Sequence, residues 1–94
     1  MAQIIQKNEQ WQLSGDVVFA NASALLSESM ALSFTNHTVV DFAQVTDVDT
    51  SAISLMLEWD RRAKAEKAIV KFINFPHNLI SLAELYDVKE IIPQ

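Results

Sequence analysis

The chain has 94 residues, of which 50% are hydrophobic and 20% are charged, the size and composition of one globular domain. It contains one glycine, Gly15, and no cysteine. Walker-A and G-x-G-x-x-G loops need several glycines to approach phosphate, so we expect no nucleotide site of either type. The absence of cysteine excludes disulfides, thiol nucleophiles and Cys-ligated zinc.

The formal net charge is −5, and all of it comes from residues 1–49, which carry six acidic residues and one lysine. Nucleic acid is usually bound by an excess of Lys and Arg, so we expect no nucleic-acid partner. The first residues lack the basic start and long apolar run of a signal peptide, and no window reaches the roughly 18 apolar residues of a membrane span. These features predict a cytoplasmic protein.

The first third of the chain predicts a hairpin followed by a helix. Alternating apolar and polar residues over 3–7 and 11–14, parted by a polar tripeptide, are typical of two half-buried strands joined by a tight turn. Gly15-Asp16 breaks this pattern, and Val17-Val18-Phe19 after it is a candidate for further extended chain. Asn21 is a residue type that caps helices, and a helix is predicted from about Ala22 to Ser33.

The rest of the chain predicts alternating strands and helices. A β-branched run over 38–42 suits a central strand, and the clearest helix runs from Ser51 to about Glu66. A further strand is predicted over 68–73, a helix that includes Pro76 in its first turn continues to Tyr86, and Ile91-Ile92 suit a last short strand. All 94 residues then form one α/β domain, with a mixed sheet of four to five strands and three to four helices packed on it.

The most informative segment begins the long helix. Asp49, Thr50 and Ser51 are all capping types, and they place three short polar side chains beside the positive end of the helix dipole. One interpretation is that one of them caps the helix and the others form local hydrogen bonds. The other is that a hydroxyl is a contact point or a phosphoacceptor, because a helix N-terminus stabilises phosphate. Asp49 would repel such a phosphate, so phosphorylation would break a contact.

The apolar surface of this helix is wider than a sheet contact requires. At about 100° per residue, one face that seats the helix on the sheet holds Ala52, Leu55, Met56, Trp59 and Ala63. Ile53 and Leu57 lie outside this face, so they either pack under a neighbouring helix or form half of a protein-binding patch rimmed by Asp60 and Lys64. We interpret the basic run 61–67 as a solvated face, with contact to membrane headgroups or to an acidic partner as the alternatives.

The sequence offers little for catalysis. His37 and His77 are far apart and lack metal-ligand spacing, so we interpret both as surface histidines. A set of Ser51, His77 and Asp49 has neither a G-x-S-x-G elbow nor a glycine-built oxyanion loop to support it. We therefore expect no catalytic residue, no metal and no cofactor, and we predict a small α/β interaction module.

Five segments of the chain resemble a known family. The run Val39-Val40-Asp41-Phe42, followed by VTDVDTSAI at 45–53, resembles the signature of STAS domains, in which a hydrophobic strand ends and a D-[ST]-[SAG]-G/A-L segment opens the second helix. The segments LEWDRRAK at 57–64, KFINFP at 71–76 and LISLAELYDV at 79–88 resemble the MlaB-type branch in particular. Nearly the whole chain can be aligned with this branch, which implies the STAS fold.

The resemblance implies a non-catalytic accessory subunit of an Mla ABC transporter, which moves phospholipids and maintains outer-membrane lipid asymmetry. The implied partner is the ATPase subunit (MlaF-like), in a complex with permease and periplasmic lipid-binding subunits at the cytoplasmic face of the inner membrane. Thr50 falls where this branch places the threonine needed for that contact. We expect Ser51, Ile53 and Leu57 on the same end and side of the helix, and include Asp49 in the partner-binding set. The isolated domain is a candidate for self-association through the same patch.

A second STAS branch, the anti-sigma-factor antagonists, implies an alternative. In that branch the phosphorylated serine is the second hydroxyl of the motif, which corresponds to Ser51. Ala52 stands here in place of the glycine usual in that branch. The alternative function is an anti-sigma-factor antagonist regulated in a partner-switching pathway, with Ser51 and Thr50 as candidate phosphoacceptors.

Overall fold

The computed structural model describes residues 2–34 and 37–85, and within them it contains four strands and three helices. The strands are β1 (Gln3–Lys7), β2 (Gln10–Val17), β3 (His37–Val48) and β4 (Ile69–Ile73). The helices are α1 (Phe19–Ser29), α2 (Thr50–Ala65) and α3 (His77–Leu85). The predicted α/β fold with a mixed sheet is confirmed, whereas the last predicted strand lies outside the described residues.

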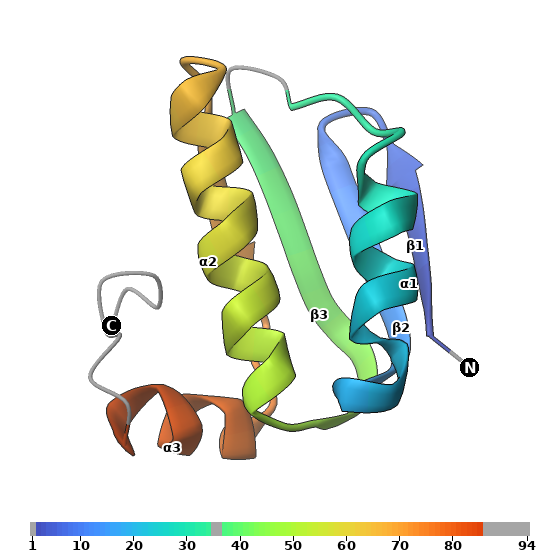
Figure 1. Cartoon of the computed structure of the whole chain (residues 1–94), viewed down its shortest axis with the longest axis vertical. Helices are drawn as coiled ribbons and strands as arrows, with labels where there is room; N and C mark the ends of the chain where they lie inside the picture. The colour runs from blue at the N-terminus through green and yellow to red at the C-terminus, as the bar shows by residue number, and fades with distance from the viewer. Residues whose placement is uncertain (1, 35–36, 86–94) are drawn as a thin grey trace.

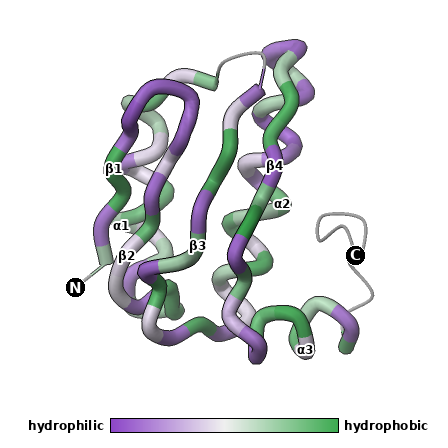
Figure 2. Tube along the Cα trace, turned by 180° about the vertical axis from the view of Figure 1, so that it is seen from behind, coloured by the Kyte–Doolittle hydropathy of each residue, from purple (hydrophilic) through white to green (hydrophobic). Residues whose placement is uncertain are grey.

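The strands lie in the order β1-β2-β3-β4. β1 and β2 form the predicted antiparallel hairpin, while β3 pairs in parallel with both β2 and β4. Each parallel connection crosses over through a helix, α1 for the first and α2 for the second. Because such crossovers are right-handed and the strand order runs in one direction, both helices cover the same face of the sheet (Figure 1). Figure 2 shows the four strands in front of these helices from the opposite side.

The strand β2 continues through Gly15-Asp16 to Val17, so the predicted extended chain is confirmed for Val17 and Val18, whereas Phe19 already begins α1. Gly15 has φ 83°, a conformation that glycine adopts without a steric penalty. The register between β2 and β3 shifts between Gln12 and Ser14 and again between Gly15 and Asp16. The glycine therefore lies in an irregular, bulged part of a continuous strand.

Helix α1 begins and ends earlier than predicted. It starts at Phe19, and Asn21 lies in its first turn, where the side-chain Nδ2 donates to the Asp16 carbonyl at 3.0 Å. Asn21 is therefore not the cap. After Ser29 the chain continues in a tight turn, in which the Leu32 N–H donates to the Ser29 carbonyl at 3.0 Å.

The core lies between the sheet and the helices. The predicted inner face of α2 is confirmed, since all five of its residues are buried: Ala52, Leu55, Met56, Trp59 and Ala63. Trp11 of β2 is fully buried and packs edge-on against Trp59, with ring centroids 5.7 Å apart. The Trp59 Nε1 donates to the hydroxyl of buried Ser29 at 2.9 Å, which ties α2 to the end of α1.

The basic run at the end of α2 is not only a solvated face. Arg62 reaches across to the end of α1, where its guanidinium donates to the Ser29 carbonyl at 2.8 Å and to the Leu32 carbonyl. The same guanidinium lies over the Phe34 ring, 4.8 Å from its centroid. Arg62 thus adds a charged donor to carbonyls at the end of α1 and in the turn that follows it. Among the described residues, no helix has the length and apolarity needed to cross a membrane.

Candidate protein-interaction site

The Asp49 carboxylate joins the first turns of two helices. Its Oδ1 accepts from the Ser51 N–H at 2.8 Å, which makes Asp49 the N-cap of α2. Its Oδ2 accepts from the Phe19 N–H at 2.9 Å, at the start of α1. The structural interpretation of the Asp49-Thr50-Ser51 triplet is therefore confirmed for Asp49, and this residue also supplies the cap that α1 lacks locally.

Two opposing effects act on the pKa of Asp49. Partial burial of the carboxyl group raises the pKa, but hydrogen bonds from the Phe19 and Ser51 N–H groups and from the Ser51 side chain outweigh it, so the pKa lies below its ordinary value of 3.8. The group is therefore ionised at neutral pH. A negative charge at this point complements the positive ends of both helix dipoles.

Asp49 leaves Thr50 at the surface. Thr50 is the first residue of α2 and is exposed, whereas Ser51 is half-buried beside the Asp49 carboxylate. The backbone that carries Thr50 is held on its N-terminal side by the cap and on its C-terminal side by the helix. An exposed hydroxyl on such a fixed backbone suits recognition by a partner, because little order has to be imposed on binding.

The other predicted site residues fall on opposite sides of α2. Ser51 and Ile53 are two positions apart and therefore roughly 200° apart around the helix. Ile53 is buried in the same core cluster as Leu79 of α3, while Leu57 on the same side keeps 38% of its surface exposed. Ile53 is therefore buried rather than part of an exposed patch, which favours the first of the two alternatives, packing under a neighbouring helix. The expectation that Ser51 shares a side with Ile53 and Leu57 is wrong, since Ser51 faces α1.

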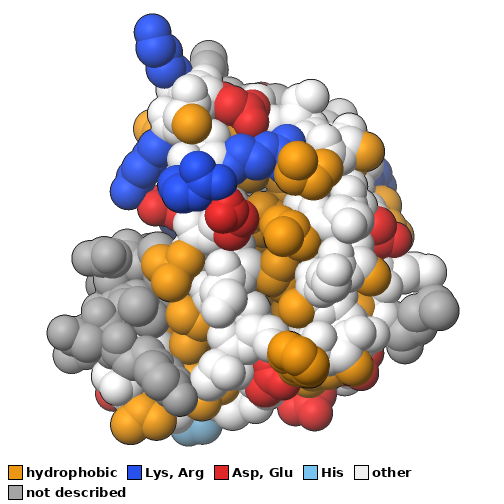
Figure 3. Space-filling model, viewed as in Figure 1, with side chains coloured by type: hydrophobic (Ala, Val, Ile, Leu, Met, Phe, Trp, Pro, Cys, Tyr) orange, Lys and Arg blue, Asp and Glu red, His pale blue; other side chains and the backbone are white. Residues whose placement is uncertain are grey.

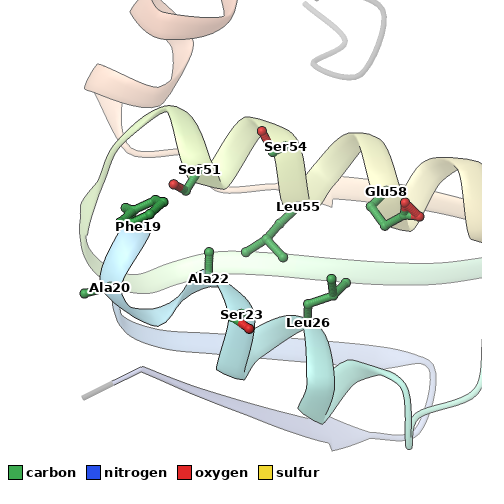
Figure 4. A pocket seen from close by; sticks show the side chains of 9 residues that line it. All are labelled: Phe19, Ala20, Ala22, Ser23, Leu26, Ser51, Ser54, Leu55 and Glu58. Carbon is green, nitrogen blue, oxygen red and sulfur yellow. The ribbon is translucent and has the colours of Figure 1, made fainter.

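Ser51 lines a groove between α1 and α2 with a volume of about 690 Å³. The remaining lining residues are small or apolar except for one carboxylate: Phe19, Ala20, Ala22, Ser23, Leu26, Ser54, Leu55 and Glu58 (Figure 4). In Figure 3 hydrophobic side chains follow the hollow between the two helices, and Lys and Arg side chains gather over the C-terminal part of α2.

Sequence reasoning missed this groove because it forms between residues about thirty positions apart. The one local signal is Phe19, a large apolar residue that follows Val17-Val18 and begins α1. It is 83% exposed in the structure, at the end of the groove where Ser51 also lies (Figure 4).

The two histidines lie at the surface, as predicted: His37 begins β3 and His77 begins α3, and both are exposed. Within residues 2–34 and 37–85, no three His, Asp or Glu side chains gather as metal ligands would. The distinctive surface of this domain is therefore the shared start of α1 and α2 together with the groove above it.

Solved structures show the same fold. A sulfate transporter family protein from Wolinella succinogenes matches with a TM-score of 0.69 at 11% identity, over 92% of this chain and 73% of that one. The anti-sigma factor antagonist SpoIIAA in its unphosphorylated form matches with a TM-score of 0.61 at 13% identity, over 100% of both chains. The structure of Mglu matches with a TM-score of 0.58 at 21% identity over 80% of this chain, which spans 20% of the Mglu chain.

The family is shown by the sequence itself. A comparison with curated proteins gave no significant match. The profile of the family described as "Mlab, STAS domain", however, matches residues 4–93, which includes both helix starts and the groove. The four-stranded mixed sheet and its structural neighbours agree with that match. The chain therefore belongs to the MlaB-type STAS domain family.

Proposed function

We propose that this chain is an accessory subunit that binds the ATPase of an Mla-type ABC transporter and supports phospholipid transport for outer-membrane lipid asymmetry. Membership of the MlaB-type STAS family over residues 4–93 is the observation that carries the proposal. In this role the protein works at the cytoplasmic face of the inner membrane, in a complex that includes the permease and a periplasmic lipid-binding subunit. The ATPase, and not this chain, binds and hydrolyses ATP.

The outward face of α2 supports such a contact physically. Thr50 and Leu57 are seven positions apart, which places them on one stripe of the helix, and both are exposed. Ser54 lies between them along the same face and is also exposed. A short stripe of small polar residues with one apolar side chain lets a partner approach the helix closely, and Leu57 supplies apolar area to bury.

Replacing Thr50 with arginine tests the proposal. The longer, charged side chain would have to be desolvated or displaced at the contact, so we expect Thr50→Arg to weaken co-purification with the ATPase at least tenfold and to lower the ATPase activity of the complex. Gln12→Arg is the matched control, because Gln12 is exposed on β2 between buried Trp11 and Leu13 and so points away from the helices.

Circular dichroism and thermal unfolding of both variants establish that the fold is intact. If folded Thr50→Arg binds the ATPase as tightly as the wild type and supports the same activity, the proposed function is wrong.

A second candidate function is that of an anti-sigma-factor antagonist regulated by phosphorylation of Ser51. The observation that favours it is the hydrogen bond between the Ser51 side chain and the Asp49 carboxylate. A phosphate on this hydroxyl would place roughly two negative charges next to the carboxylate that caps both helices. Phosphorylation would therefore disturb the starts of α1 and α2 together. Phosphopeptide mass spectrometry of the protein isolated from its own cells tests this candidate. If neither Ser51 nor Thr50 is phosphorylated under any growth condition, regulation by phosphorylation has no mechanism and this second candidate function is wrong.

A further inference from the structure

The groove between α1 and α2 leaves apolar surface unburied. Leu26 and Ala22 on the α1 side are only partly buried, and Phe19 at one end is 83% exposed. On the α2 side, Leu55 belongs to the core but also reaches the groove floor. Covering this surface would be favourable, since burial of apolar area contributes about 25 cal/mol per Å².

The dimensions of the groove suit an α-helix. Its lining residues run from Phe19 to Leu26 on α1 and from Ser51 to Glu58 on α2. Each wall thus covers about two helical turns, or roughly 10 Å. A helix laid along it presents side chains at i, i+3 or i+4, and i+7 over the same length. Both walls are helix surfaces, so an added strand would find no sheet edge to pair with, and the small side chains of Ser23 and Ser54 allow close approach.

The charge around the groove selects a basic occupant. The α1 wall has no cation, and Glu28 is the one charged residue of α1. Glu58 lines the other wall and already pairs with Arg61. Carboxylates lie at the end occupied by Phe19, where Asp49 caps the start of α1 and exposed Asp47 stands two residues before Asp49, whereas Lys and Arg side chains gather over the other end of α2 (Figure 3).

We infer that this groove is a second docking site for the ATPase and that it receives one amphipathic helix of that partner. The helix carries apolar side chains spaced i, i+3 or i+4, and i+7, with a Lys or Arg at the end nearest Phe19. The inference rests on the proposed function, because it assigns this helix to the same ATPase. It adds to that function a contact on the α1 side of α2, next to the stripe of Thr50, Ser54 and Leu57.

The test uses the full chain and the ATPase. Ser23→Arg fills the groove and adds a positive charge where the inference places a basic helix, so its affinity for the ATPase should fall at least tenfold. Ala24→Arg is the matched control, because Ala24 is exposed on the same helix but does not line the groove. We expect the affinity of Ala24→Arg to stay within twofold of the wild type, and thermal unfolding establishes that both variants are folded.

The outcomes separate the inference from the proposed function. If Ser23→Arg binds the ATPase with wild-type affinity while Thr50→Arg loses binding, the groove is not a docking site, but the proposed function is still supported. Wild-type affinity in both variants overturns both. Equal losses in Ser23→Arg and Ala24→Arg indicate a general effect of charge on α1 and also overturn the groove.

Crosslinking identifies the occupant. A photoreactive benzophenone residue at position 23, irradiated in the complex with the ATPase, should yield adducts on partner residues spaced three, four and seven apart in one helix with a basic end. Adducts confined to a loop or a strand, adducts only to a second copy of this chain, or no adduct to a bound ATPase each contradict the inference.

Discussion

Replacing Asp49 tests whether one carboxylate holds the starts of both α1 and α2. Its two oxygens accept from the Ser51 N–H at 2.8 Å and from the Phe19 N–H at 2.9 Å. Loss of an N-cap side chain costs typically about 1 kcal/mol, so removal of both caps in Asp49→Ala should lower the free energy of unfolding by about 2 kcal/mol. Asparagine has a single acceptor oxygen, so Asp49→Asn keeps one cap and should lose about 1 kcal/mol.

Urea and thermal unfolding, followed by circular dichroism, measure these losses. For a domain of this size 1 kcal/mol corresponds to roughly 4–8 °C in Tm, so we expect Tm to fall by about 8–16 °C in Asp49→Ala and by about half as much in Asp49→Asn. Asp47→Ala is the control, since among residues 2–34 and 37–85 this exposed carboxylate bonds only the N–H of adjacent Val48, at 2.9 Å, and the change in stability should be less than about 0.5 kcal/mol. Equal losses in the two Asp49 variants, or an Asp49→Ala loss no larger than that of the control, would refute the double cap.

The pH dependence of stability in the wild type and in Asp49→Asn gives a second test of the same hydrogen bonds. The folded pKa of Asp49 lies below the ordinary value of 3.8, so its stabilising effect is fully present above that value and is lost as the pH falls through the lower folded pKa. The difference in free energy of unfolding between the wild type and Asp49→Asn, which has no titrating group there, should be constant from pH 7 to about 5 and should narrow below about pH 4. A difference that keeps its full size down to about pH 2 contradicts the assigned hydrogen bonds.

Two further predictions concern the other end of α1. Arg62→Ala should lower the free energy of unfolding by about 2 kcal/mol, because the carbonyls of Ser29 and Leu32 lose a charged donor, while Arg61→Ala should unfold in urea close to the wild type, since it breaks only a surface ion pair. Trp59→Phe should cost about 1–2 kcal/mol through loss of the buried bond to Ser29. In a double-mutant cycle monitored by thermal unfolding, Ser29→Ala should then cost less in the Trp59→Phe background than in the wild type, and strict additivity of the two losses would contradict the coupling.

Features that depend on residues close in sequence could be predicted. The alternation over 3–7 and 11–14 predicted a hairpin, and its first strand has the bounds observed for β1. The spacing of apolar residues in α2 predicted its buried face, because helical periodicity repeats within a few residues. The strand and helix order then followed from the alternation of these patterns along the chain.

Features that depend on residues distant in the sequence could not be predicted. Local capping rules pointed to Asn21 as the start of α1, but the acceptor for the Phe19 N–H comes from Asp49, thirty residues further along. The end of α1 is likewise satisfied by Arg62, about thirty residues away from the carbonyls that it bonds. A charged residue on a helix occupies the same kind of sequence position whether its side chain is solvated or bonds a neighbouring helix or strand. Its position in the sequence alone therefore predicts neither outcome.

These distant bonds also explain how the domain can present two surfaces from one point. Thr50 is the first residue of α2 and lies between the side of the helix that carries Leu57 and the side on which Ser51 faces the groove. The separation of the groove walls at this end depends on Asp49, because the same carboxylate bonds the first turns of α1 and α2. A partner that contacts Thr50 therefore meets two helices whose relative position is already fixed, and it can cover Leu57 or enter the groove without having to order either helix.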